Sequence, residues 1–215
     1  MHNRKRAFYP IMTKLYPIIV FEGLDFAGKT TVLNRLKTEY PDIAYLHEPG
    51  GTEISEEIAT ILANYGKRMQ KHTKTLLFEA ARSELVQKLK TLQTQKPIIL
   101  DRFVGSTLAY QSYGDGQDLN ELIHFNEYVL DDLTIDTTVL FNISIKTMLE
   151  RKATRLEKID ELDQYDSNYY QTISDNYYNA ISDTPTKYIV EIDANQDIDT
   201  VYEQVVEMLK KYEVL

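Results

Sequence analysis

Short apolar runs alternate with longer amphipathic segments along this chain. The runs are rich in β-branched residues and lie at residues 18–21, 42–46, 98–100, 137–144 and 186–192. Four of them begin directly after a proline, which cannot donate a hydrogen bond within a sheet and therefore suits the entry to a strand. These prolines are Pro17, Pro41, Pro97 and Pro185. The runs predict strands buried on both faces, as in a parallel sheet.

The segments between the runs have the spacing of amphipathic helices. They lie at residues 29–40, 54–63, 73–94, 118–131, 145–158, 163–182 and 198–212. The apolar stripe of the third consists of Leu76, Leu77, Ala80, Leu85, Leu89 and Leu92. Strands that alternate with helices favour a doubly wound, mostly parallel α/β sheet. We expect one domain over residues 16–215, preceded by a loosely held extension over residues 1–15.

Composition narrows the function classes. The chain has 215 residues and a formal net charge of −9, which disfavours a surface that coats nucleic acid or an anionic membrane. It contains no cysteine, so neither disulfides nor thiolate metal sites are expected. The N-terminus lacks the apolar core of a signal peptide, and no later stretch is apolar enough to span a membrane. We therefore expect a cytoplasmic protein without nucleic-acid or membrane partners.

One stretch carries a specific phosphate-binding pattern. The sequence GLDFAGKT at residues 23–30 matches G-x-x-x-x-G-K-[ST] and stands between a predicted strand and a predicted helix. Glycines allow backbone N–H groups to approach phosphate oxygens, the Lys29 ammonium reaches the β- and γ-phosphates, and the Thr30 hydroxyl ligates magnesium. The loop serves ATPases, GTPases and kinases alike. The chain lacks the N/T-K-x-D motif of GTPases, which lowers that option.

Further polar residues follow other predicted strands. Asp101 and Arg102 end the run at 98–100, where a carboxylate can reach a magnesium ion and a guanidinium can bind a phosphate through two donors. Phe78 and Arg82 are four residues apart on one helical face. Alone, such a pair is typical of core packing with a surface charge, and Asp101-Arg102 is also compatible with a surface ion pair.

Taken together, these segments resemble bacterial thymidylate kinases, which are P-loop nucleoside monophosphate kinases. The stretches FEGLDFAGKTT, EPGGT, LLFEAAR, DRFVGSTLAYQ and IDANQ occur in the family's order and spacing, over about residues 16–212. The resemblance implies a P-loop NTPase-type three-layer α/β/α fold with a five-stranded parallel sheet. It also implies transfer of the γ-phosphoryl group of ATP to dTMP with Mg²⁺, and a homodimer.

The resemblance also implies roles for single residues. On the donor side, Lys29 and Thr30 would hold phosphates and magnesium, and Asp101 would support the metal through water. The other residues expected to contact ATP are Gly23, Leu24, Asp25, Phe26, Ala27, Gly28, Thr31, Ala194 and Asn195.

On the acceptor side, Arg102 would clamp the monophosphate, Phe78 would stack on thymine, and Arg82 would bind the O4 carbonyl. Thr107 and Gln111 would hydrogen-bond the base. The remaining expected contacts are Tyr110 at the deoxyribose, Asp25 at the sugar hydroxyl, Glu48 before the turn that lines the site, and Tyr170 at the pocket wall.

The chain departs from the family pattern in its charges. Positions 24–27 of the phosphate loop carry no basic residue, so the transfer needs arginines from a lid at about 149–165, where Arg151 and Arg155 are available. We therefore expect Lys29, Arg102, Arg151 and Arg155 to be catalytic. Asp115 and Glu161 stand where the family often has arginine. These changes leave open a kinase for another deoxynucleotide or deoxynucleoside, or a weakly active nucleotide-binding paralogue.

Overall fold

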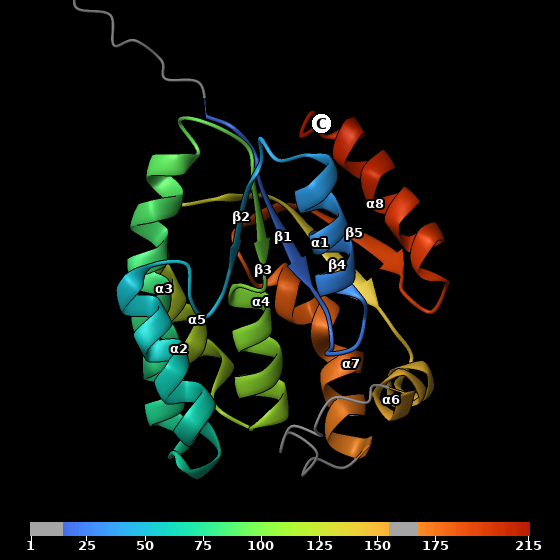
Figure 1. Ribbon diagram of the computed structural model, residues 1–215. Helices are drawn as coiled ribbons and strands as arrows, with labels where there is room; N and C mark the ends of the chain where they lie inside the picture. The colour runs from blue at the N-terminus through green and yellow to red at the C-terminus, as the bar shows by residue number, and fades with distance from the viewer. Residues whose placement is uncertain (1–14, 155–166) are drawn as a thin grey trace, which may run out of the picture.

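The computed structural model describes residues 15–154 and 167–215, which build a parallel sheet between two layers of helices (Figure 1). The strands are β1 (Ile18–Glu22), β2 (Ala44–His47), β3 (Ile98–Asp101), β4 (Ile135–Asn142) and β5 (Thr186–Asp193). Their order across the sheet is β2-β3-β1-β4-β5, and all pairings are parallel. The predicted α/β class with a five-stranded parallel sheet is confirmed.

Burial of the strands varies with their place in the sheet. The central strand β1 is buried along its whole length, as are Ile98, Ile99 and Leu100 of β3. The edge strands differ, since no residue of β2 is fully buried and Tyr188 of β5 is 58% exposed. The prediction that every strand is buried on both faces is therefore wrong for β2 and β5, because an edge strand has a neighbour on one side only.

The helices connect successive strands. They are α1 (Lys29–Glu39), α2 (Glu53–Tyr65), η1 (Gly66–Arg68), α3 (Lys71–Leu92), α4 (Val104–Thr107), the π-helix η2 (Leu108–Gly114), α5 (Leu119–Leu130), α6 (Ile145–Thr154), α7 (Ser167–Ser182) and α8 (Ile198–Lys211). Right-handed crossovers place α1 on one face, in contact with α8, and α3, α5 and α7 on the other. The predicted helix over 145–158 is described as far as Thr154 only.

The buried face of α3 differs from the predicted apolar stripe. Leu76 is 52% exposed and Ala80 is also exposed, whereas Thr75, Glu79 and Arg82 are buried in the same part of the helix. The predicted apolar stripe is therefore wrong for the first half of α3, because the side chains that point inward there are polar and form hydrogen bonds with neighbouring elements. Farther along α3 the core is apolar as expected, with Leu85, Val86 and Leu89 fully buried.

The carboxyl ends of the five strands meet at one edge of the sheet, the lower edge in Figure 1. The loop between β1 and α1, the turn between β3 and α4, and the loop between β5 and α8 all lie at this edge. Ligands of open α/β sheets bind at the carboxyl ends of the strands. The motifs that the sequence singled out thus converge in space because of the parallel topology.

Candidate active site

The phosphate loop has a backbone that only particular residues allow. Gly23 has φ 137°, and a Cβ atom added there would lie 2.6 Å from the carbonyl oxygen of Phe141. Gly28 has φ 94° and ends the loop directly before α1. Glycine is therefore required at both positions, by close approach at the first and by left-handed backbone at both. The positive end of the α1 dipole points into the loop.

Lys29, the first residue of α1, is folded into this loop. Its ammonium nitrogen donates to the carbonyl oxygens of Gly23 and Leu24, each at 2.8 Å, and its side chain is buried. Burial and, to a smaller extent, the positive charge of Arg102 lower the pKa of Lys29 to about 8, although the charges of Asp25 and Asp101 act in the opposite direction. The ammonium is thus held by the loop itself at the place where donor phosphates are expected.

Arg102 has an unusual backbone and a well-defined side chain. Its φ is 64°, in the left-handed region that non-glycine residues seldom occupy. Nη1 donates to Ser106 Oγ at 3.0 Å and to Tyr177 Oη at 3.4 Å, while Nη2 pairs with Asp25. Burial disfavours the charge of Arg102, but Asp25 and the neighbouring tyrosines outweigh it and hold the pKa well above its ordinary value. The guanidinium is permanently charged and linked to the phosphate loop.

The residues expected at a magnesium ion fit that group. Across residues 15–154 and 167–215, Asp101 Oδ1 is buried without a hydrogen-bond partner, at the carboxyl end of β3. Thr30 is exposed beside Lys29, whose charge Asp101 stabilises. No cluster of three His, Cys, Asp or Glu side chains suited to a metal occurs in these ranges. A magnesium ion that takes most of its ligands from phosphates and water needs only such sparse protein ligands.

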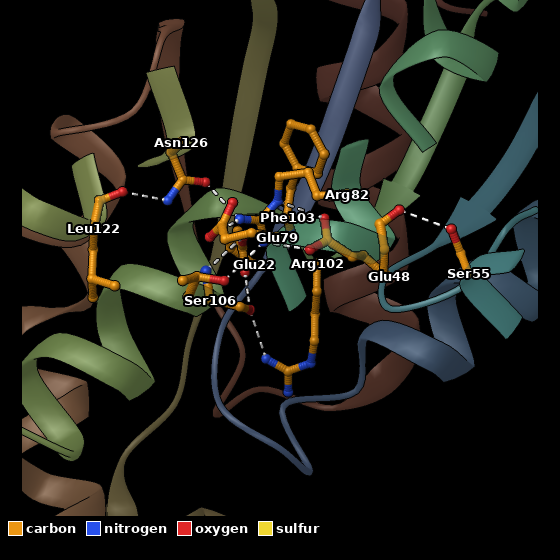
Figure 2. Close-up of polar contacts among 12 residues, drawn as sticks. Glu22, Glu48, Ser55, Glu79, Arg82, Arg102, Phe103, Ser106, Leu122 and Asn126 are labelled. Atoms are coloured by element: carbon orange, nitrogen blue, oxygen red, sulfur yellow. Dashed lines mark hydrogen bonds and ion pairs between the residues drawn. The ribbon is translucent and has the colours of Figure 1, made fainter. Parts of the chain in front are cut away.

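Arg82 is the centre of a buried polar cluster, part of which Figure 2 shows. Nε and Nη2 donate to the carboxylate of Glu48, and Nη2 also donates to Thr107 Oγ1 at 2.8 Å. Nη1 donates to Glu79 Oε1 at 2.8 Å and to Asn126 Oδ1 at 2.5 Å. These contacts engage all five N–H groups of the guanidinium. To bind a base carbonyl, as the resemblance implies, Arg82 has to exchange one of these acceptors.

The cluster holds two carboxylates against one guanidinium. Burial raises the pKa of Glu48 to about 7, although the nearby charge of Arg82 lowers it. Because the folded-state pKa lies above the ordinary value of 4.5, the folded protein binds a proton that the unfolded chain releases between these two pH values. Stability therefore falls as the pH rises from about 4.5 to 7, and stays lower above that range.

We expect Glu48→Gln to remove this pH dependence. The free energy of unfolding of the native chain should fall, relative to that of the variant, by on the order of 3 kcal/mol between pH 4.5 and pH 8. Urea denaturation of both proteins at several pH values measures the difference. Parallel stability curves would show that Glu48 is ionised throughout this range.

The other predicted acceptor residues lie around η2. Thr107 and Gln111 are buried, and Tyr170 of α7 is 6% exposed. Tyr110 packs edge-on against Tyr177 and lies under the Arg102 guanidinium, 5.5 Å from the ring centroid. Its hydroxyl is buried without a hydrogen-bond partner among the described residues. Phe78 is partly exposed on α3. Aromatic rings and an unpaired hydroxyl thus border the region between Arg102 and the Arg82 cluster.

The predicted adenine end of the site lies at the loop after β5. Ala194 is buried, and Asn195 Oδ1 accepts from the backbone N–H of Ser144 at 2.9 Å. Arg151 of α6 bridges this loop and the phosphate loop, since it donates to the carbonyl oxygens of Gln196 at 3.0 Å and Phe26 at 3.3 Å. Arg151 therefore lies beside the donor loop, where its guanidinium binds backbone carbonyls. Arg155 and Glu161 lie outside the described residues.

Asp115, which replaces an expected arginine, has partners of its own. It pairs with Lys74 of α3 at 3.7 Å and accepts a hydrogen bond from Tyr169 of α7 at 3.3 Å. These contacts fasten the end of η2 to two helices. The negative charge at this position is thus partly offset by a lysine.

The sequence pattern indicated no role for Glu22, Ser106 or Tyr177. The hydroxyls of Ser106 and Tyr177 donate to the carboxylate of Glu22 next to Arg102, and Glu22 is fully buried. A signal was present, because Glu22 is a charged residue at the end of the most apolar strand, directly before the phosphate loop. The buried Glu79 and Asn126 were also missed.

Comparison with known proteins agrees with this geometry. Residues 21–205 match the family model described as thymidylate kinase. The chain is 34% identical over 200 residues to a thymidylate kinase of Staphylococcus epidermidis, an alignment that covers 90% of this chain and 97% of the relative. It is 36% identical over 199 residues to the thymidylate kinase of Mycoplasma capricolum, covering 89% of this chain and 93% of the relative.

A solved structure is similar as well. The crystal structure of thymidylate kinase from Ehrlichia chaffeensis superposes with a TM-score of 0.66 at 25% sequence identity. The match covers 91% of this chain and 98% of that protein. Sequence and structure thus point to the same group of enzymes over nearly the whole length.

Proposed function

Since this chain belongs to the thymidylate kinase family, we propose that it transfers the γ-phosphoryl group of ATP to dTMP, giving dTDP and ADP. One observation carries the proposal at the level of the site. Arg102 is fixed at the carboxyl edge of the sheet, contacts Asp25 of the phosphate loop, and is close enough to Lys29 to lower its pKa. Two cations from different strand ends therefore converge where a donor and an acceptor phosphate would meet.

The geometry suits phosphoryl transfer without a strong general base. The phosphate oxygen of a nucleoside monophosphate is already ionised, so catalysis consists mostly of alignment and of neutralising charge on the moving group. Lys29 binds the donor phosphates, Arg102 binds the acceptor phosphate, and Arg151 holds the donor loop. Thr30 and Asp101 would hold a magnesium ion, which supplies further positive charge at the donor phosphates.

Selection of dTMP is proposed to come from the residues around η2. Phe78 would supply an aromatic plane for the base, while Arg82, Thr107 and Gln111 would supply polar groups at its edge. Tyr110 and Tyr170 would limit the space at the sugar. Discrimination against ribonucleotides follows if the Tyr110 ring occupies the space that a 2′-hydroxyl needs.

Assembly and location are proposed from the family alone. A homodimer would cover the large apolar side chains that α2, α3 and α5 expose. These are Ile54, Ile61, Tyr65, Leu76, Phe125 and Tyr128. Sedimentation velocity of the full chain measures this oligomeric state.

None of the helices described here has the length and apolar character needed to cross a membrane. We place the enzyme in the cytoplasm, which suits a chain without cysteine.

A panel of acceptors tests the proposed function. ADP release from ATP and Mg²⁺ is measured with dTMP, dUMP, dCMP, dGMP, UMP and thymidine. We expect dTMP to give the highest kcat/KM, and thymidine to give no turnover because it lacks the phosphate that Arg102 binds. A higher kcat/KM with another monophosphate would assign that nucleotide as the acceptor in place of dTMP. Preference for thymidine would make the protein a nucleoside kinase.

A further inference from the structure

Glu22 ends β1 and receives four hydrogen bonds at its buried carboxylate. Oε1 accepts the backbone N–H groups of Phe103 at 2.9 Å and Ser106 at 3.0 Å. Oε2 accepts the hydroxyls of Ser106 at 2.6 Å and Tyr177 at 2.9 Å. The donors come from the turn after β3, from α4 and from α7. A single carboxylate thus joins three elements at the edge of the sheet where the phosphate loop begins.

The two contacts at Oε1 fix the backbone next to Arg102. Phe103 precedes α4 and has no side chain able to cap the helix. Glu22 does this from another strand, since it binds the N–H of Phe103 and the N–H three residues later, the two groups that a capping box satisfies. The turn thus held contains Arg102 in its left-handed conformation, with φ 64°. That conformation is costly for arginine and persists because its surroundings impose it.

The two contacts at Oε2 orient the Arg102 side chain. Ser106 and Tyr177 each have one hydroxyl proton. Their oxygens lie 2.9 Å from each other, but a carboxylate is a stronger acceptor than a hydroxyl, so we assign both protons to Glu22. Their oxygen lone pairs remain free to accept, and both accept from Arg102 Nη1, at 3.0 Å and 3.4 Å. The carboxylate thus determines the direction of two hydroxyls, which in turn aim the guanidinium. Figure 2 shows Glu22 and Ser106 in this relation to Arg102.

We propose that Glu22 is a positioning residue, which acts through Ser106 and Tyr177 to hold the Arg102 guanidinium in the orientation that binds the acceptor phosphate. The inference rests on the proposed function, because it assigns the purpose of Arg102 to the acceptor. Glu22 itself is fully buried, so this role requires no contact between Glu22 and the substrate. Its loss should therefore affect the acceptor much more than ATP.

The variant Glu22→Gln separates the two halves of this arrangement. The amide oxygen can still accept both backbone N–H groups, so the turn is kept. The amide nitrogen donates, so the hydroxyls must accept from it. The 2.9 Å contact between the two hydroxyls can take only one of their protons, so the other has no acceptor and turns toward the N–H groups of Arg102. We expect kcat/KM for dTMP to fall roughly 10–100-fold, a size typical of misplaced catalytic groups, with KM for ATP nearly unchanged. Glu207→Gln, an exposed change of the same charge on α8, is the matched control.

Two further variants distinguish positioning from a merely structural role. Ser106→Ala removes one relay hydroxyl but keeps both backbone contacts, and should lower kcat/KM for dTMP less than Glu22→Gln does. In the Arg102→Ala background, Glu22→Gln should have almost no further effect on that constant. A full effect in this background would overturn the proposal, and so would unchanged kinetics in Glu22→Gln with only a lower melting temperature.

The readouts also keep this inference apart from the proposed function. If the native protein does not phosphorylate dTMP, the proposed function fails. Calorimetric titration with dTMP then tests the inference alone, because orientation of the phosphate-binding guanidinium affects affinity with or without transfer. Equal dTMP affinity in the native protein and in Glu22→Gln, or no dTMP binding to either, would contradict the positioning role.

Discussion

Replacing Arg102 by alanine is expected to lower kcat/KM for dTMP by about 10³-fold or more, a size typical of arginines that neutralise charge in phosphoryl transfer. The guanidinium is the group that connects Asp25 of the phosphate loop with the hydroxyls of α4 and α7. Without it, two phosphate groups of like charge would have to approach each other with little compensation. Steady-state kinetics with varied dTMP at saturating ATP measure the loss.

Two controls make the Arg102 experiment specific. Arg68→Ala removes the same charge from an exposed position on η1 and should leave kcat/KM unchanged. Arg102→Lys keeps the charge but loses the planar fork, and should recover only part of the activity. Full activity in Arg102→Lys would show that charge alone matters. Full activity in Arg102→Ala would remove Arg102 from the acceptor site.

Replacing Lys29 by methionine is expected to lower kcat by about 10²–10³-fold, the usual effect of losing one preorganised donor to developing charge. Methionine has a similar length and apolar stem, so α1 should still form. The ammonium lies inside the phosphate loop, where it donates to the carbonyl oxygens of Gly23 and Leu24, and there it would neutralise charge on the transferred phosphate. Single-turnover experiments with bound ATP and dTMP separate the transfer step from binding.

A lysine on the exposed surface of the same helix serves as the control for Lys29. Lys37→Met lies in the last turn of α1, remote from the phosphate loop, and should retain the native rate. Circular dichroism of both variants checks that the helix is intact. An unchanged transfer rate in Lys29→Met would mean that the loop binds its ligand through backbone N–H groups alone.

The sheet could be predicted because central strands are buried and therefore consist of short runs of apolar residues that are visible in the sequence. The apolar runs at 18–21 and 98–100 correspond to β1 and β3, and Pro17, Pro97 and Pro185 directly precede strands. The run at 42–46 was placed two residues early, since β2 begins at Ala44. The run at 137–144 was placed two residues late, since β4 already begins at Ile135. The edge strands β2 and β5 carry similar runs, so sequence alone could not distinguish them from central ones.

The convergence of the phosphate loop with Asp101 and Arg102 was predictable for a topological reason. In a parallel sheet, residues that follow different strands share one edge whatever their separation in sequence. A pattern search can use this rule without knowing any side-chain contact. The same rule places the Ala194–Asn195 loop near the donor loop.

The buried polar partners could not be predicted, because their burial depends on distant residues. Glu79 and Asn126 meet at Arg82 from two helices, and the Arg82–Asn126 contact spans 44 positions. Glu22 depends on Ser106 and Tyr177, which lie 84 and 155 positions away. From sequence alone, a glutamate among apolar residues is predicted to lie at a strand end or on a helix surface, because its hydrogen-bond partners are not known. Predicting such residues requires the tertiary fold first.

The fate of the γ-phosphate shows whether this chain phosphorylates dTMP. The native protein is incubated with Mg²⁺, dTMP and ATP labelled at the γ-phosphate, and the labelled products are separated by anion exchange. We expect the label to move from ATP to dTDP, and to stay in ATP when dTMP is left out. Label that remains in ATP with dTMP present, or appears only as inorganic phosphate, would contradict it.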